Sequence, residues 1–405
     1  MFLARYLSKL DKESFLSLAF QGLNLLLPLL IARTLLNDSS ETLIDYEKII
    51  SLVAFFSIVG DFGASQFFSS KTYTSRFLNK VYSTLFCFRL VNFCVSIIFI
   101  ALLNFAFDQS FTLTVIASTL LLLSTSESAI AFLNKGKAYY FVLLSSVKFV
   151  VFLGLYFSGF ELFVALVIAY VVSFTAFLFF SVQFKLQKPS LRVMTLFYKR
   201  YVNYFLSDLF TSLFTQLDSY LISATLSAEQ SVIYIVCRKV IRAALSAINV
   251  IYKIIFVRAD RGGVSLNNAV FFVVLYALGC FSLVNLFSEQ IFSIITGKDI
   301  EFIPQVEVMR ISMVILSSLL IFGVLKSIIS NVYIFTNGLF SLHLKATIFS
   351  SLFFTVPLVF SELFGEVLDV VVISSLRLMT DIVYLLVIYS YYRLASNATF
   401  SRKSS

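Results

Sequence analysis

Stretches of about twenty apolar residues, separated by short polar segments, follow one another along almost the whole chain. A transmembrane helix needs about 20 consecutive apolar residues, so the pattern predicts an all-α polytopic membrane protein. The stretches predict twelve spans, at 14–35, 49–69, 83–106, 111–133, 138–158, 162–183, 201–225, 230–256, 267–288, 308–333, 340–361 and 367–391. Because most of the polar connections are short, we expect neighbouring helices to be antiparallel.

The composition agrees with this prediction. Of the 405 residues, 59% are hydrophobic and 13% are charged, whereas a soluble domain has about 25% charged residues. No segment begins like a cleaved signal peptide, so we expect the first span itself to direct insertion. The four cysteines and the single histidine, His343, have neither metal-site nor disulfide spacing. We interpret the cysteines as small buried residues and His343 as a loop residue, and we expect no cofactor and no metal.

The charges of the polar segments predict the orientation, because Lys and Arg accumulate in cytoplasmic loops. With the N-terminus inside, the cytoplasmic segments hold 19 basic and three acidic residues, and the opposite segments hold 14 acidic and two basic residues. A miscounted span would mix the two sets. The charges therefore predict twelve spans with both termini in the cytoplasm. The same bias accounts for the net charge of +9, so we expect no nucleic-acid partner.

The longest cytoplasmic segment divides the chain into two halves. When the first span is shifted by 190 positions onto the seventh, seven of 22 positions are identical, where roughly two are expected by chance. The repeat predicts an N-terminal six-helix bundle at 1–183, a basic cytoplasmic linker at 184–200, a C-terminal six-helix bundle at 201–395 and a cytoplasmic tail at 396–405. The linker is expected to lie on the inner leaflet.

Charged residues inside the predicted spans are the strongest functional signal. A charge that faces lipid near the bilayer centre costs several kcal/mol, so such groups must pair, reach the interface or line a polar interior. They are Arg33, Arg89, Lys148, Arg238, Lys239, Arg242, Lys253, Arg310, Lys326, Arg377, Asp61, Glu127, Asp208, Asp218 and Asp381. Arg33, Arg310 and Lys253 are close enough to span ends to reach the interface. Arg377 and Asp381 are four positions apart, which favours an intrahelical pair over a transport role.

The eighth span has the clearest pattern. Arg238, Arg242 and Asn249 recur at spacings compatible with one face of a helix, and the opposite positions are apolar. Arg238 and Arg242 lie too far inside the span to reach an interface, so this face is predicted to line a solvated interior.

The first and seventh spans carry matching polar stripes, with Gln21 and Asn24 in the first span and Thr211 and Asp218 in the seventh. Polar stripes often only hold membrane helices together. Their recurrence in both halves, beside the basic eighth span, favours residues that line a central cavity.

Several short motifs resemble polysaccharide flippases of the Wzx type, within the superfamily of multidrug, oligosaccharidyl-lipid and polysaccharide exporters. The resemblance covers essentially the whole chain and is strongest in QLDSYLI at 216–222, in IY at 233–234 and in FVR at 256–258, with DFG at 61–63 as a further match. Three positions depart from the family pattern: Ser219 replaces a common basic residue, Val232 the usual Gly, and Val257 the usual Pro.

The resemblance implies two six-helix bundles around a central cavity and a function in moving lipid-linked oligosaccharides. The substrate would be an O-antigen or related unit on undecaprenyl pyrophosphate, carried from the cytoplasmic to the outer leaflet of a bacterial inner membrane by alternating access. Arg238, Arg242 and Lys239 would attract the pyrophosphate, and Gln21, Asn24, Thr211, Asp218 and Asn249 would line the cavity. Asp61, Asp208 and Asp218 are candidates for ion coupling. The implied partners are a polysaccharide polymerase and a chain-length regulator, and the protein is expected to be a monomer.

Two alternatives remain open. A membrane polysaccharide polymerase or ligase would have a similar number of spans, but such enzymes carry a long external loop, and the longest external segment here, around 289–307, is short. A drug exporter of the same superfamily would favour an acidic cavity, whereas ten basic and five acidic residues lie inside the predicted spans.

Overall fold

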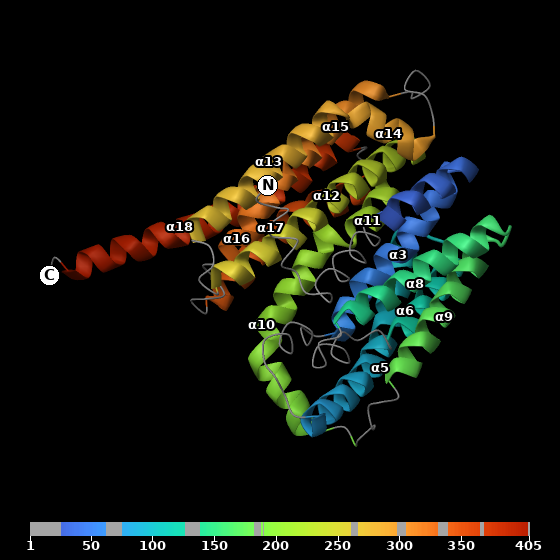
Figure 1. The fold of residues 1–405 in the computed structure, drawn as a ribbon, viewed down its shortest axis with the longest axis horizontal. Helices are drawn as coiled ribbons and strands as arrows, with labels where there is room; N and C mark the ends of the chain where they lie inside the picture. The colour runs from blue at the N-terminus through green and yellow to red at the C-terminus, as the bar shows by residue number, and fades with distance from the viewer. Residues whose placement is uncertain are drawn as a thin grey trace. The chain divides into compact units, whose positions relative to one another are not determined.

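The computed structural model describes residues 26–61, 75–125, 138–181, 188, 190–260, 266–297, 305–330, 339–364 and 368–403. The backbone of these residues is helical apart from turns and short connections, and they contain no strand (Figure 1). The chain forms two compact units, Met1–Phe205 and Leu206–Ser405. The prediction of an all-α polytopic protein is confirmed.

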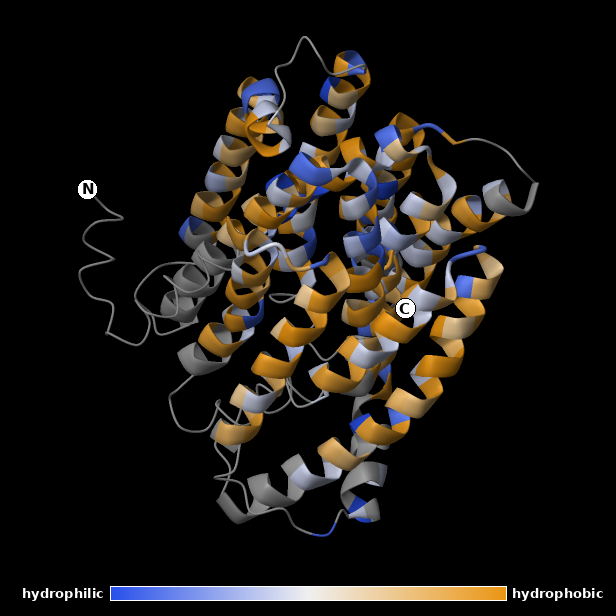
Figure 2. Ribbon diagram, turned by 90° about the vertical axis from the view of Figure 1, so that its right-hand side faces the viewer, coloured by the Kyte–Doolittle hydropathy of each residue, from blue (hydrophilic) through white to orange (hydrophobic). Residues whose placement is uncertain are grey.

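The described helices have the apolar character of membrane spans. Most of the coloured ribbon is hydrophobic, and hydrophilic residues lie at helix ends and at scattered positions within the helices (Figure 2). Within the described residues, five helices are long and apolar enough to cross a membrane, and a bent helix pair makes a sixth. Parts of the predicted spans at 14–35, 49–69 and 111–133 lie outside the described residues.

The first unit contains α3 (Ser40–Asp61), α5 (Ser75–Ala106), α6 (Phe111–Ser124), α8 (Ala138–Phe157) and α9 (Leu162–Ser181). Residues 26–38 are also helical. Helix α6 packs against α3, α5 and α9, and α8 packs against α9. Ser110 caps α6 by accepting a hydrogen bond from the Leu113 N–H, and the buried Asn104 side chain donates to Thr114 at 2.8 Å, which ties α5 to α6.

The second unit is built around α12 (Ala228–Asp260), which packs against α11 (Asp218–Thr225), α13 (Leu266–Leu286), α15 (Val306–Ser317), α16 (Leu319–Ile328) and α18 (Val370–Lys403). Helix α18 also packs against α15, α16 and α17 (Phe340–Phe364). Helix α10 (Leu191–Thr215) begins in the first unit and ends in the second. This packing brings α11, α12, α16 and α18 together around the polar residues of the unit.

Two predicted spans of the second unit are broken helices. The seventh span divides into α10 and α11 at Gln216 and Leu217, and its helix begins at Leu191, ten residues before the predicted start at 201. The ninth span ends in α13, and α14 (Ser288–Thr296) then turns away by 68°. Backbone at such breaks has unpaired polar groups, which need partners inside a membrane.

Most of the remaining predicted boundaries agree with the described helices, but α3 begins at Ser40 and α5 at Ser75, nine and eight residues before the predicted starts at 49 and 83. Two other ends also differ. Helix α10 makes 191–200 helical, and α18 continues as one helix to Lys403 through most of the predicted tail (Figure 1). The division of the chain into predicted bundles, linker and tail stays a prediction.

Candidate functional site: a buried polar cluster in the second unit

The first part of the cluster is an ion pair between α11 and α12. Arg238 Nε donates to Asp218 Oδ2 at 2.5 Å, and Nη2 donates to Asp218 Oδ1. Arg238 Nη1 also donates to Ser219 Oγ at 2.6 Å, and Tyr234 Oη donates to Asp218 Oδ2 at 3.3 Å. Arg238 and Asp218 are 6% and 1% exposed. A two-pronged contact of this kind is the strongest geometry for an Arg–carboxylate pair.

The ion pair also compensates for the break between α10 and α11. In a continuous helix the Ser219 N–H would donate to the Thr215 carbonyl. Here the Ser219 N–H donates to Asp218 Oδ1 at 2.9 Å, and Arg238 Nη2 donates to the Thr215 carbonyl at 2.8 Å. Asp218 also lies in the first turn of α11, where the helix dipole stabilises a negative charge. Side chains therefore supply partners for the backbone groups at the break.

Arg242 and Lys239 extend this group along α12. Arg242 Nη2 donates to Gln216 Oε1 at 3.2 Å, so a second arginine also reaches the break between α10 and α11. Arg242 is half-buried and Lys239 is buried. The prediction of a basic face on this helix thus corresponds to two arginines that contact the same short segment.

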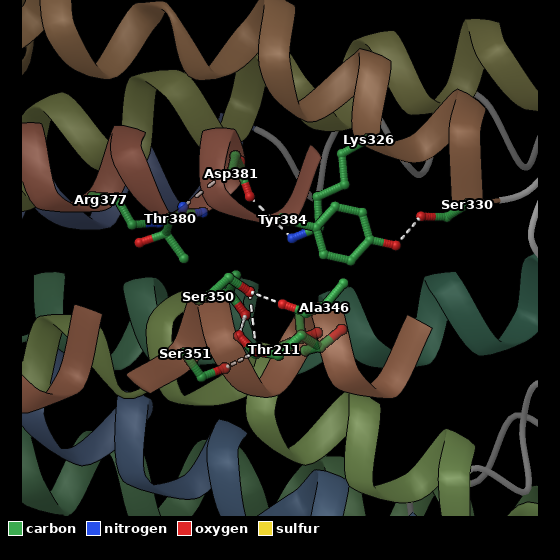
Figure 3. A network of polar contacts seen from close by, with 12 residues as sticks. Thr211, Lys326, Ser330, Ala346, Ser350, Ser351, Arg377, Thr380, Asp381 and Tyr384 are labelled. Atoms are coloured by element: carbon green, nitrogen blue, oxygen red, sulfur yellow. Dashed lines mark hydrogen bonds and ion pairs between the residues drawn. The ribbon is translucent and has the colours of Figure 1, made fainter. Parts of the chain in front are cut away.

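A second ion cluster joins α16 to α18. Lys326 Nζ donates to Asp381 Oδ1 at 3.0 Å, and Arg377 Nη1 lies 3.7 Å from Asp381 Oδ2 (Figure 3). Lys326 and Arg377 are thus bridged by one carboxylate. The predicted intrahelical pair of Arg377 and Asp381 exists, but Lys326 from another helix makes the shorter contact. Sequence analysis did not connect Lys326 with these residues, because 55 residues separate it from Asp381.

Phe214 connects the two parts of the cluster. The Lys326 ammonium lies 4.8 Å and the Arg377 guanidinium 5.0 Å from the centre of its ring. Phe214 is fully buried and immediately precedes Thr215, whose carbonyl binds Arg238. A cation close to an aromatic ring is stabilised by about 0.5–2 kcal/mol, more when desolvated. The aromatic ring therefore partly replaces the water that these two cations lose.

Tyr384 forms a neutral extension of the cluster. Its hydroxyl lies 2.7 Å from Ser330 Oγ and 2.5 Å from His343 Nδ1, and its ring lies 4.7 Å from Lys326 Nζ (Figure 3). The prediction that His343 is a loop residue is wrong, because His343 lies in α17 and contacts a buried tyrosine of α18. Ser330 lies in a stretch of π-helical backbone at 329–330, a conformation that is frequent at functional sites.

The polar residues of α10 and α17 hold these two helices together. Ser207 Oγ lies 3.1 Å from Thr347 Oγ1, and Ser351 Oγ donates to the Phe210 carbonyl at 2.6 Å. Thr211 of α10 is half-buried (Figure 3), and its carbonyl accepts a hydrogen bond from Thr215 Oγ1 at 2.9 Å. Ser207, from the polar side of the seventh span, therefore helps to hold two helices together, which is the alternative to lining a cavity.

The other predicted site residues are not brought into this cluster by the described contacts. Asp208 is half-buried on α10, and its carbonyl accepts from Ser212 Oγ at 2.6 Å. Gln21 and Asn24 lie outside the described residues, as do the side chains of Asp61 and Asn249. Their roles in cavity lining and ion coupling stay predictions, and so does the pyrophosphate role of Arg238, Arg242 and Lys239.

Two charges of the first unit, the buried Arg89 and the half-buried Lys148, have local partners. Arg89 Nη1 donates to the Thr125 carbonyl at 3.1 Å, and Lys148 Nζ lies 5.0 Å from the centre of the Tyr170 ring. Of the residues expected at an interface, Arg33 is exposed, and Arg310 is exposed and paired with Glu289. The cysteines differ from the prediction: Cys237 is buried, Cys87 and Cys280 are half-buried, and Cys94 is exposed.

The charge balance of the cluster is positive. Among the described residues joined by these contacts, Arg238, Arg242, Lys326 and Arg377 contribute four positive charges, and Asp218 and Asp381 contribute two negative ones. Lys239 is a further cation next to Arg238 on α12. Within the described residues, no group of three His, Cys, Asp or Glu residues could hold a metal ion. A buried site with an excess of cations attracts an anion, because little water is present to screen the charges.

No family model and no curated protein matches the sequence. Solved structures of membrane transporters do match its fold. The lipid II flippase MurJ in an inward closed conformation is 15% identical, with a TM-score of 0.64 over 94% of this chain and 87% of that chain. A MATE transporter in complex with MaL6 is 14% identical, with a TM-score of 0.60 over 94% of this chain and 95% of that chain.

An inward-facing multidrug resistance MATE family transporter of the MOP superfamily is also 14% identical, with a TM-score of 0.57 over 96% of this chain and 99% of that chain. At these identities the likeness concerns the fold and not the substrate. The chain is a multi-pass membrane protein whose helical fold is similar to that of these transporters.

Proposed function

We propose that this protein is a flippase for an anionic lipid-linked oligosaccharide. The observation that carries the proposal is the excess of cations in the buried cluster of the second unit. A pyrophosphate that links a lipid to a sugar has an ionised oxygen on each phosphorus, so its charge would balance this excess. The similarity in fold to a lipid II flippase supports the same class of substrate.

In this proposal the substrate is an O-antigen or related unit on undecaprenyl pyrophosphate, and the protein lies in a bacterial inner membrane as a monomer. Alternating access would move the head group from the cytoplasmic to the outer leaflet while the lipid tail stays in the bilayer. An inside-negative potential would favour this direction for an anion, by about 2.3 kcal/mol per charge per 100 mV. A polysaccharide polymerase and a chain-length regulator would use the product.

Arg242 is the best residue for a test. Loss of Arg238 would leave the buried Asp218 carboxylate without its two-pronged partner, so a negative result could reflect misfolding. Arg242 contacts a neutral amide, Gln216, at the same helix break. Arg310 supplies the matched control, because it is an exposed cation on α15 whose side chain is 56% exposed.

The experiment reconstitutes the protein in liposomes and measures flipping of a fluorescent polyprenyl-pyrophosphate oligosaccharide. We expect wild type and Arg310→Gln to flip the lipid, and Arg242→Gln to do so about tenfold more slowly, the effect of losing one charge-assisted contact. Absence of flipping by well-folded wild-type protein would refute the proposal, as would an unchanged rate in Arg242→Gln.

A drug exporter of the same superfamily is the second candidate, supported by the similarity in fold to MATE transporters. The buried carboxylates Asp218 and Asp381 could attract a cationic drug, but both contact basic side chains. Ethidium transport in the same liposomes distinguishes the two candidates: uptake that depends on Asp218 or Asp381, without flipping of lipid, would favour the exporter.

A further inference from the structure

The ion cluster of α16 and α18 leaves one strong hydrogen-bond donor unsatisfied. Arg377 is 9% exposed, and its Nη1 atom has no hydrogen-bond partner. The nearest carboxylate oxygen, Asp381 Oδ2, lies 3.7 Å away, which is too long for a hydrogen bond. A buried charged donor without a partner is costly, because the lost interaction with water is not replaced.

The Asp381 carboxylate is shared between the two cations. Asp381 lies one helical turn after Arg377, and its other oxygen, Oδ1, is held by Lys326 Nζ at 3.0 Å. One carboxylate therefore bridges two cations but satisfies only one of them well. An anion that is not attached to the chain, and that carries more oxygens, could contact both cations at hydrogen-bond distance.

The surroundings favour an anion further. Both cations lie against the ring of Phe214, next to the break between α10 and α11 where Arg238 and Arg242 bind. Sites in membrane transporters are often formed where helices are interrupted. On the other side, Gly323 of α16 has no side chain, and a Cβ placed there would lie 3.9 Å from Asp381 Oδ2. No side chain of residue 323 therefore covers this carboxylate oxygen.

We propose that Lys326 and Arg377 form a phosphate-binding subsite in which Asp381 is the resident counter-ion that the phosphate displaces. Phosphate suits this pair because an arginine fork binds two of its oxygens, while lysine acts as a point charge. The subsite rests on the proposed function, since it would hold the pyrophosphate of the lipid-linked substrate. It adds to that function a second pair of cations, one from α16 and one from α18; of these, the sequence predicts only an intrahelical contact of Arg377 with Asp381.

The test measures equilibrium binding of inorganic pyrophosphate to purified protein in nanodiscs, with Arg377→Gln, Asp381→Asn and the surface control Arg310→Gln. We expect Arg377→Gln to bind about tenfold more weakly, because a charge-assisted contact is lost. Asp381→Asn should bind more tightly than wild type, because the competing carboxylate is gone, and Arg310→Gln should bind like wild type. A purely structural ion cluster would not produce opposite changes in Arg377→Gln and Asp381→Asn.

Misfolding is controlled by Arg377→Lys, which keeps the charge and loses the fork; it should bind with intermediate affinity. The subsite is refuted if wild type does not bind pyrophosphate, if Arg377→Gln binds like wild type, or if Asp381→Asn does not bind more tightly. A second binding measurement with farnesyl pyrophosphate tests whether the bound anion is a lipid head group or a free phosphate compound. Binding of both probes supports a lipid head group, whereas binding of inorganic pyrophosphate alone supports a free phosphate anion at the same subsite.

The two proposals can fail separately. If wild type flips the lipid and Arg242→Gln flips it more slowly, but Arg377→Gln keeps wild-type affinity and flipping, the proposed flippase function is supported and the subsite is refuted. If no variant flips the lipid but pyrophosphate binds with the expected dependence on Arg377 and Asp381, the subsite stands and the transported substrate must be another phosphate compound.

Discussion

Arg238 holds both carboxylate oxygens of Asp218 and, with the same guanidinium group, the Thr215 carbonyl that the break between α10 and α11 leaves without a helical partner. One side chain therefore neutralises a buried charge and closes a gap in a helix. Sequence analysis assigned Arg238 to pyrophosphate and Asp218 to cavity lining or ion coupling. The structure shows that the two residues bind each other, so a change at either one alters the partner as well.

Arg238→Met should destabilise the protein by about 3–5 kcal/mol, because it leaves the buried Asp218 carboxylate without its partner. The double variant Asp218→Asn with Arg238→Met should lose less than Arg238→Met alone, because no uncompensated charge remains. Thermal unfolding in detergent measures both. Equal losses in the single and double variants would mean that the pair is not coupled in this way.

Tyr384→Phe should lower the free energy of unfolding by about 1–3 kcal/mol, because Ser330 and His343 each lose a buried hydrogen-bond partner. The ring beside Lys326 is kept. Tyr389→Phe on the same helix is the matched control, because Tyr389 is 61% exposed. We expect it to unfold like wild type; a similar loss in both variants would contradict the role of the Tyr384 hydroxyl.

Gly323→Ala should leave the fold intact and raise stability by about 0.5–1 kcal/mol, because alanine is the better helix residue. The new Cβ would lie 3.4 Å from Leu245 Cδ2, an ordinary contact distance. Gly323→Leu should instead destabilise by about 1–3 kcal/mol through overpacking beside Leu245 and Asp381. Thermal unfolding of the two variants tests the packing of α16 against α12 and α18; identical behaviour would show that α16 has room to move.

Cysteine labelling tests the predicted orientation. In a variant without the native cysteines, Glu161→Cys, between α8 and α9, should react with an impermeant maleimide in intact cells. Lys188→Cys, before α10, should react only after permeabilisation. Both positions are exposed in the structure. The expectation comes from the excess of basic residues in the segments assigned to the cytoplasm, and labelling of both positions from outside would overturn the topology.

Hydrophobic length was a reliable guide to the helices. The predicted spans at 138–158, 162–183 and 340–361 agree with α8, α9 and α17 to within three residues at each end, because the bilayer core sets the length of an apolar helix. The breaks at Gln216 and Phe287 could not be predicted, because their residues are compatible with a continuous helix. A break forms only where another element supplies partners for the freed backbone groups, as Arg238 does for Thr215.

For the candidate site, the sequence showed that charges lie inside the membrane and that cations exceed acids, and it identified Arg238, Arg242 and Asp218. It did not show which charges meet. The spacing of Arg377 and Asp381 within one helix predicted their contact correctly, whereas the contact with Lys326 depends on the packing of α16 against α18. The position of His343 near a predicted span boundary, beside Lys345, predicts a loop residue, and the sequence does not reveal its buried partner Tyr384.

The sequence by itself determined that this is a polytopic helical protein with an interior that is net positive, since both follow from counting apolar and charged residues along the chain. The tertiary structure alone decided that these charges form two linked ion clusters around Phe214 and that Arg377 is left with an unsatisfied donor. The physical reason is that the free-energy cost of placing a charge in a membrane follows from the residue type. The contacts that offset this cost depend on which helices pack together.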